Sequence, residues 1–206
     1  MDHTLTDIEV RVLGALIEKE ITTPDYYPLS LNALVAACNQ SSNRNPVMHL
    51  DEGAVADAME GLREKKLAHK VERGESRVVK YRHVLYEALN WGRPVIGVMC
   101  VLMLRGPQTV GEIRTRSNRL YDFTSLDEVE LTLNSLMSGD SPLVTRLPRQ
   151  SGQKEVRYAH LLSGEAAFTE QEHEPEAEPE LDRIGKLEQE VEELKRQFAE
   201  FRKQFE

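Results

Sequence analysis

Apolar and polar positions follow two different periods along the chain, and the change from one to the other is clearest between residues 51 and 83. Apolar residues recur at helical spacing from 55 to 62 and then at alternate positions from 67 to 81. Asp51 precedes the helical part as a cap, and Gly74 falls in the polar turn between the two alternating runs. The stretch predicts a helix and a β-hairpin, the second half of a winged helix-turn-helix.

The preceding residues supply the first half of such a domain. Thr6–Glu9 has the form of a capping box, so a helix is expected from there to about Lys19. Residues 22–28 hold two prolines and predict a connector, after which Ser30 opens a second helix. A long polar joint at 39–49 then leads to the helix that follows Asp51. Residues 1–85 are therefore expected to form one winged-helix domain.

The same pattern returns about 75 residues later. Apolar residues 95–104 predict a helix, and Thr109–Glu112 and Ser125–Glu128 resemble further capping boxes. A second hairpin is expected at 143–160, where its return strand reads VRYAH against VKYRH in the first. This internal repeat predicts an α+β, mostly helical fold of two tandem winged helix-turn-helix domains, the second at 86–163.

The remaining residues predict a linker and a coiled coil. Residues 164–180 are acidic and proline-bearing, which is typical of a flexible linker. In residues 181–206 apolar positions alternate at spacings of three and four, the seam of a coiled-coil helix. A parallel homodimer is expected, and the alternative is a helix that folds back on its own domains. The predicted oligomerisation residues are Ile184, Leu187, Val191, Leu194, Phe198, Phe201 and Phe205.

Charge is divided unevenly along the 206 residues. The formal net charge is -9 and the mean hydropathy is -0.49. Residues 1–162 hold 20 Lys and Arg against 21 Asp and Glu, a net of -1, and residues 163–206 hold 6 against 14, a net of -8. Within the nearly neutral body, residues 63–82 carry eight basic residues and three acidic ones. The acidity belongs to the tail, and the first hairpin is a local basic patch.

No arrangement of residues predicts catalysis or a cofactor. The chain has no GxSxG, P-loop or GxGxxG motif, and its histidines show no HxxxH or HExxH pairing. Cys38 and Cys100 lie in apolar helical patterns and are expected to be reduced, buried side chains. His83 and His160 end the two return strands, where a structural role explains them better than a metal site. We therefore expect a non-enzyme without metal or cofactor. No apolar run is long enough to span a membrane and no signal segment opens the chain, so a cytoplasmic location is expected.

Nucleic-acid binding is the common use of a winged helix, but the predicted recognition helices carry acidic residues in their N-terminal halves. This counts against reading of base sequence. Positive charge lies on the hairpins instead, although solvated strands often carry Lys and Arg for solubility alone. Arg44 in the polar joint is a further candidate, with the ordering of that loop as its alternative role. The candidate nucleic-acid contacts are Arg44, Lys66, Lys70, Arg73, Arg77, Lys80, Arg82, Arg146, Arg149 and Lys154.

Two functions remain open from the residues. The first is a DNA-associated regulatory or architectural protein that holds double-stranded DNA by its backbone through the two hairpins. The second is a protein-interaction module that docks a protein partner through acidic helix faces and the coiled coil.

Three runs of sequence resemble a known family. Residues 22–48 (TTPDYYPLSLNALVAACNQSSNRNPVM), 104–123 (LRGPQTVGEIRTRSNRLYDF) and 156–165 (VRYAHLLSGE) are similar to the YceH-like family of bacterial proteins, a domain of unknown function. The resemblance covers roughly residues 4–165. It implies a pair of winged-helix domains and implies no activity, cofactor or catalytic residue.

Overall fold

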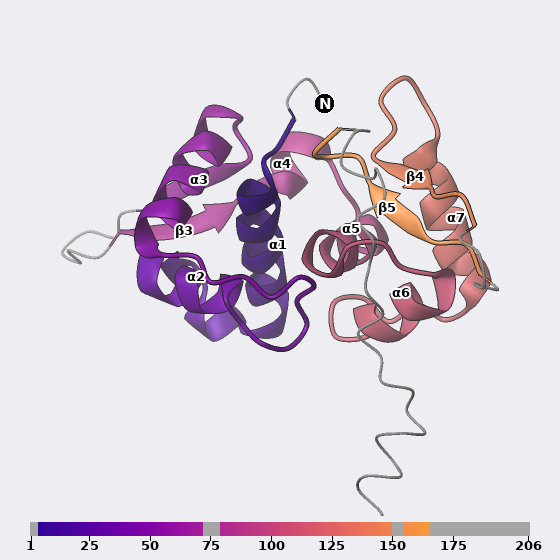
Figure 1. Cartoon of the computed structure of the whole chain (residues 1–206), viewed down its shortest axis with the longest axis horizontal. Coiled ribbons are helices and arrows are strands. Elements are labelled where there is room, and N and C mark those ends of the chain that lie inside the picture. Colours follow the sequence, from indigo (N-terminus) through magenta and orange to yellow (C-terminus); the bar gives the residue numbers. More distant parts are fainter. Residues whose placement is uncertain (1–3, 72–78, 150–154, 165–206) are drawn as a thin grey trace, which may run out of the picture. The chain divides into compact units, whose positions relative to one another are not determined.

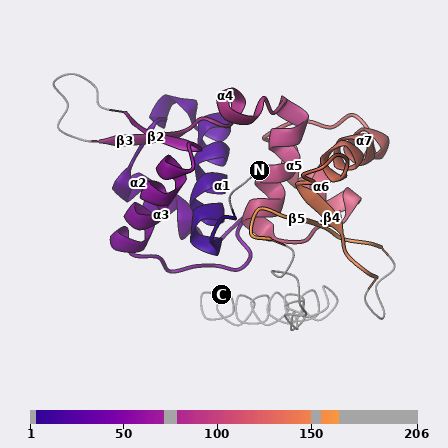
Figure 2. The same ribbon diagram turned by 90° about the horizontal axis from the view of Figure 1, so that it is seen from above.

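Helices outnumber strands in the computed structural model, which describes residues 4–71, 79–149 and 155–164 (Figures 1 and 2). Within those residues the chain forms seven α-helices, one short 3-10 helix and five short strands. This confirms the α+β class predicted from the sequence. The predicted linker beyond residue 164 and the coiled-coil seam at 184–205 lie outside the described residues.

The first half of the chain runs helix, strand, helix, helix and hairpin. A capping box opens its first helix as predicted, because the Glu9 amide donates to Thr6 Oγ1 and the Thr6 amide donates to Glu9 Oε2. Asp51 caps the third helix by accepting from the Ala54 amide at 2.8 Å. The elements are α1 (Asp7–Thr22), η1 (Pro24–Tyr26), β1 (Leu29–Ser30), α2 (Leu31–Cys38), α3 (Glu52–Glu64), β2 (Ala68–Val71) and β3 (Lys80–His83).

The second half has the same order of helices and hairpin after a short extra helix at Leu85–Leu89. Thr109 and Glu112 form the predicted capping box. The box predicted at Ser125 is only half made, because the Glu128 carboxylate accepts from the Thr124 amide and the Tyr121 hydroxyl instead of the Ser125 amide. The elements are α4 (Leu85–Leu89), α5 (Arg93–Arg105), α6 (Val110–Ser117), α7 (Leu126–Met137), β4 (Val144–Arg146) and β5 (Tyr158–His160).

Strand pairing is similar in the two halves. In the first, β3 lies between β1 and β2, and Leu29 pairs with Tyr81. In the second, β5 pairs with β4 on one side and with Gln108, through an isolated bridge at Tyr158, on the other. Tyr81 and Tyr158 hold the same position in VKYRH and VRYAH. The internal repeat seen in the sequence therefore extends to the topology.

The two halves are joined along α1 and α5, which lie side by side at the centre of Figures 1 and 2. A Cβ on Gly14 of α1 would stand 2.9 Å from Leu104 Cδ2 of α5, so only glycine allows this approach without displacing Leu104. The Cys100 thiol of α5 donates to the Gly14 carbonyl at 3.6 Å. Both halves belong to one compact unit, and the division of the chain into domains at residue 85 stays a prediction.

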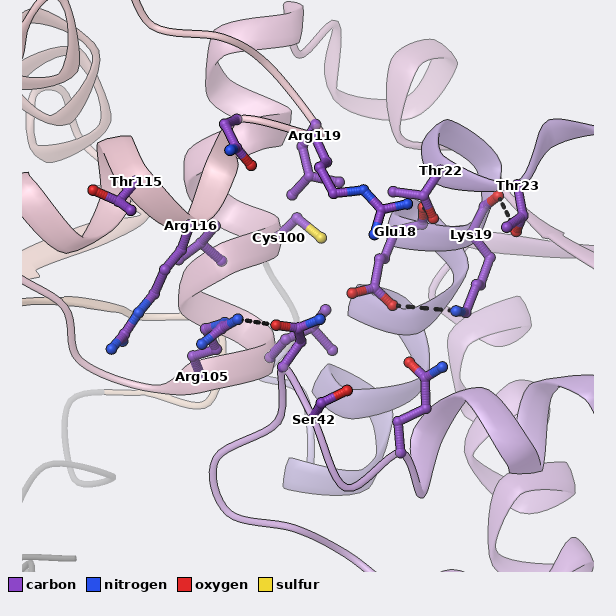
Figure 3. Close-up of a pocket in the computed structure, with 16 residues that line it drawn as sticks. Glu18, Lys19, Thr22, Thr23, Ser42, Cys100, Arg105, Thr115, Arg116 and Arg119 are labelled. Carbon is purple, nitrogen blue, oxygen red and sulfur yellow. Dashed lines mark hydrogen bonds and ion pairs between the residues drawn. The ribbon is translucent and has the colours of Figure 1, made fainter. Parts of the chain in front are cut away.

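The long polar loop at 39–50 also bridges the halves. Asn39 closes its base, since its side chain donates to the Leu50 carbonyl and accepts from the Leu50 amide. The Asn45 amide donates to the Leu104 carbonyl at 2.9 Å, and Arg105 on α5 donates to the Asn43 side chain (Figure 3). A loop that belongs to the first half by sequence is thus bonded to the end of α5.

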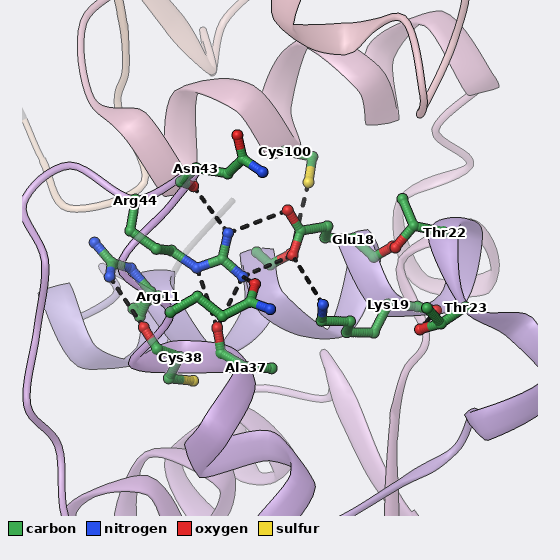
Figure 4. Close-up of polar contacts among 12 residues, drawn as sticks. Arg11, Glu18, Lys19, Thr22, Thr23, Ala37, Cys38, Asn43, Arg44 and Cys100 are labelled. Carbon is green, nitrogen blue, oxygen red and sulfur yellow. Dashed lines mark hydrogen bonds and ion pairs between the residues drawn. The ribbon is translucent and has the colours of Figure 1, made fainter. Parts of the chain in front are cut away.

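Arg44 holds this loop from inside (Figure 4). Its side chain is fully buried and forms a bidentate pair with Glu18, at 3.1 and 2.6 Å, while it also donates to the carbonyls of Ala37 and Asn43. A guanidinium with these partners has no donor left for a phosphate. The assignment of Arg44 to nucleic-acid contact is therefore not supported by its placement, and the alternative, ordering of the loop, fits it.

A second buried arginine lies beside the first. Arg11 donates to the carbonyls of Cys38 and Pro46 at 3.2 and 2.6 Å, which ties α1 to the end of α2 and to the middle of the loop. Burial, and next the positive charge of Arg44, lower the pKa of Arg11. Glu18 pairs with Arg44 and so offsets the charge of one of these two arginines.

The two histidines that end β3 and β5 are structural. His83 Nδ1 accepts from the Leu85 amide, and its Nε2 lies 2.8 Å from a Glu20 carboxylate oxygen. Burial lowers the pKa of His160 to about 4, and the negative charge of Asp7 opposes this only in part. Among the described residues no group of three or more His, Cys, Asp and Glu is placed to hold a metal ion.

Replacing Arg44 by methionine should lower the free energy of unfolding by about 3 to 5 kcal/mol, because it leaves the Glu18 carboxylate and the Ala37 carbonyl without their partner. Urea unfolding at neutral pH measures this. Arg149→Met, which changes an exposed arginine, is the matched control and should stay within about 0.5 kcal/mol of the parent. Equal stability of the two variants would contradict the role given to Arg44.

His160 should make the protein sensitive to mild acid. Its lowered pKa means that the unfolded chain binds a proton below about pH 6.5 while the folded chain does not until about pH 4. Stability is thus fully present above this window and lost as the pH falls through it. Between pH 7 and pH 5 the parent should lose about 2 kcal/mol more than His160→Phe does, measured by urea unfolding at both pH values. A parallel loss in both proteins would count against this assignment.

Candidate nucleic-acid interface

Two of the described basic residues predicted on the first hairpin are paired with carboxylates. Lys70 Nζ lies 3.0 Å from a Glu60 oxygen on α3, and an Arg82 nitrogen lies 3.2 Å from a Glu87 oxygen on α4. Both pairs are largely exposed and weak, yet each places a carboxylate next to the cation. Arg73 and Arg77 lie outside the described residues, as does Lys154 of the second hairpin.

Lys66 and Lys80 differ from these, because neither makes an ion pair with another described residue. Lys66 follows the last turn of α3 in a left-handed conformation, with φ of 58°, and its side chain is exposed. Lys80 begins β3 and is half-buried. These two lysines bracket the start and the return of the hairpin, so they are its strongest described candidates for contact with an anion.

The second hairpin offers two further cations. Arg146 at the end of β4 and Arg149 beyond it are exposed and form no ion pair within the described part of the chain. Arg157 on the return side is used internally, because it donates to the Pro107 carbonyl at 2.9 Å and to Glu112 at 3.0 Å. Among the described residues, each half therefore presents two basic residues without an ion pair on or beside its hairpin.

The helices that would enter a groove in a winged helix are acidic at their exposed positions, as the sequence indicated. On α3 these positions include Glu52, Asp57 and Glu60. Hydrogen bonds from Lys70 and then Arg63 lower the pKa of Glu60, so that carboxylate stays ionised well below neutral pH. Several fixed negative charges on this face would repel the phosphates on either side of a groove.

On α7 the exposed face combines acids with large apolar side chains. Asp127 and Glu130 are exposed, Leu131 is 69% exposed and Leu126 is 46% exposed. The buried residues of this helix recur at helical spacing, with Val129, Leu133 and Leu136 inside. An exposed leucine on a surface helix is common, and two on one helix beside carboxylates suit contact with protein better than contact with DNA.

A pocket that sequence reasoning missed lies between the halves (Figure 3). It has a volume of about 390 Å³ and is bounded by the last turns of α1, the loop after α2, one face of α5 and the end of α6. Its basic lining residues are Lys19, Arg105, Arg116 and Arg119. The one available signal was the RTRSNR run at 114–119, but its relation to Lys19 depends on how α1 and α5 pack.

The cysteines are not reactive groups. Cys38 and Cys100 are both free and buried, as predicted. Burial raises the pKa of Cys38 to about 12, and burial likewise raises the pKa of Cys100. Neither thiol is ionised near neutral pH, which leaves both as packing residues. None of the helices within the described ranges is long and apolar enough to cross a membrane.

Comparison with known proteins places the chain in a family. A family model described as a protein of unknown function, DUF480, matches residues 5–153. A UPF0502 protein from Pelobacter propionicus is 52% identical over 98% of this chain and 95% of its own length. UPF0502 proteins from Solibacter usitatus and Geobacter sulfurreducens are 52% and 47% identical over the full length of both chains. These matches confirm the resemblance to an uncharacterised bacterial family, and the chain belongs to the DUF480 family.

Proposed function

We propose that this protein is a tandem winged-helix protein that associates with double-stranded DNA by holding its backbone with both hairpins. The observation that carries the proposal is the repeated topology, in which three helices precede a hairpin whose return strand pairs on both sides. Strand, helix, helix and hairpin in this order are what a winged helix requires. Fold alone does not fix function, so the argument also depends on the charges.

The unpaired cations support contact with phosphate. Lys66 and Lys80 in the first half, and Arg146 and Arg149 in the second, have no carboxylate partner among the described residues. A cation already paired within the protein must give up that partner before it binds phosphate, whereas an unpaired one releases counterions from DNA at no such cost. Backbone contacts of this kind fix position on the duplex and carry no sequence information.

The acidic faces of α3 and α7 bear on whether the protein would read base sequence. Arg, Lys, Asn and Gln are the side chains that commonly read base edges, and α3 presents Glu52, Asp57 and Glu60 instead. We therefore expect binding that depends weakly on sequence and strongly on salt. An architectural or regulatory role, in which the hairpins grip two positions on a duplex, fits these properties.

Titration of the full chain against a short duplex over a range of salt should give micromolar to submillimolar affinity that falls as salt rises. Changing Lys66 and Lys80 together to glutamine should reduce the slope of log K against log salt by about 2, because each lost phosphate contact removes about 0.9. Lys70→Gln is the matched control from the same hairpin. Its ammonium is already paired with Glu60, so it should change the slope less.

Two results would overturn this proposal. One is an affinity that remains millimolar at low salt. The other is an affinity that does not change with salt, because contact with phosphates releases counterions.

A second candidate function is a protein-interaction module, and the exposed face of α7 is the observation that favours it. Leu126 and Leu131 lie exposed on this helix near Asp127 and Glu130. A partner with an apolar groove rimmed by basic residues would cover both kinds of side chain. The proposed homodimer through residues 181–206 would present two such faces.

Leu131→Asp separates the two candidates. If α7 docks a protein, the variant should lose a partner that the parent captures from a bacterial lysate, as measured by quantitative mass spectrometry, and should keep its salt-dependent binding of DNA. Asn134→Asp, an exposed change of the same charge on the same helix, is the control. If both variants capture the same proteins as the parent, the proposed docking of a partner through α7 is contradicted.

A further inference from the structure

The pocket between the halves has more positive charge than its own carboxylates can neutralise. Of its 16 lining residues four are basic, and Glu18 is the acidic one. Both Glu18 oxygens accept from Arg44, which lies behind the pocket wall and adds a further positive charge. Lys19 Nζ is 3.8 Å from Glu18, a longer separation than either contact with Arg44. The carboxylate is thus already used within the protein.

The four cations are not equally available. Arg116 is held by Gln108 and, at 3.3 Å, by Glu112, so it is the least free. Arg105 donates to the neutral Asn43 side chain and keeps its full charge unopposed at that contact. Arg119 makes no hydrogen bond or ion pair with another described residue. Figure 3 shows its side chain reaching toward Glu18 and Thr22 of α1, whereas Arg116 points away from them.

The positive charges of Arg105 and Arg116 lie close enough to disfavour one another. Burial, and next the positive charge of Arg116, lower the pKa of Arg105. Glu18 and Glu112 oppose this effect only in part, since Glu18 is bonded to Arg44 and Glu112 to Arg116 and Arg157. A cluster in which cations outnumber acids is unfavourable for the empty protein and favourable for an anion that enters it. The neutral lining adds side chains that can hydrogen-bond an oxyanion, among them Ser42 and Asn118, and apolar contact from Leu104 and Leu120.

We propose that this pocket binds a small dianion, a phosphate monoester or a dicarboxylate, with Arg119, Lys19 and Arg105 as its cationic contacts. Guanidinium groups bind both classes of oxyanion in a bidentate manner, and an ammonium adds a point charge. The volume of about 390 Å³ lies in the range of small-molecule sites. The pocket is separate from both hairpins, so the proposal does not depend on DNA binding.

Binding should also strengthen the joint between the halves. Lys19 and Ser42 come from the first half, and Arg105 and Arg119 come from the second. A ligand that bridges them binds only when α1 and α5 are packed together, so it stabilises that packing by mass action. The expected signs are a higher melting temperature and slower amide exchange at residues 18–23 and 115–120.

The test uses the full chain and isothermal titration calorimetry with inorganic phosphate, adenosine monophosphate and succinate at constant ionic strength, with chloride as the reference anion. At least one dianion should bind one site with Kd tighter than about 1 mM. Preference between the phosphates and succinate identifies the class of ligand. Hydrogen exchange with the best probe should slow at residues 18–23 and 115–120 of the unmodified protein, which tests the location without any substitution.

Arg119→Gln and Lys19→Gln should each weaken binding at least about tenfold, since each removes a charge-assisted hydrogen bond. Arg119→Lys, which keeps the charge, should weaken it less. Arg93→Gln, which changes an exposed arginine at the start of α5 that does not line the pocket, should bind as the parent does. Binding of no probe at 5 mM (about five times the expected limit), equal binding in all four variants, or slowed exchange only away from the pocket would overturn the proposal.

Discussion

The buried ion pair between Arg44 and Glu18 is the interaction on which the arrangement of the two halves depends. Arg44 fixes the loop at 39–50 to α1 and α2, and the same loop is bonded to α5 through Asn45 and Asn43. Breaking one partner of such a pair would leave an uncompensated buried charge. The pair therefore helps to hold the loop against α1, next to the packing of α1 on α5 that joins the halves.

Some basic side chains of this protein form ion pairs within the protein, and others do not. Arg44, Lys70, Arg82 and Arg157 already have carboxylate partners, and their contribution to binding an external anion is reduced accordingly. Among the described residues, the cations without a carboxylate partner include Lys66, Lys80, Arg146 and Arg149 at the hairpins and Arg105 and Arg119 in the pocket. A count of basic residues alone would place the strongest anion site on the first hairpin. Among the described residues, several of those cations are paired internally, which leaves the pocket as the stronger candidate.

Local features could be predicted from the sequence, and tertiary ones could not. The caps at Thr6, Asp51 and Thr109 and the hairpin return strands follow from residues close in sequence, so pattern alone was enough. The box at Ser125 failed in part because Tyr121 competes for the Glu128 carboxylate. Burial of Arg44 and the pocket both depend on the packing of α1 against α5, and no periodicity encodes which loop lies over that contact. The close approach at Gly14 likewise became visible only in three dimensions.

Hydrogen exchange of the full chain with and without duplex DNA tests the central claim, that the hairpins and not the helices α3 and α7 contact the nucleic acid. The account predicts slowed exchange at residues 66–71, 80–83 and 144–149 and no change at 52–60 or 126–135. Slowed exchange confined to α3 and α7 would contradict it, because it would place the acidic helix faces against the duplex.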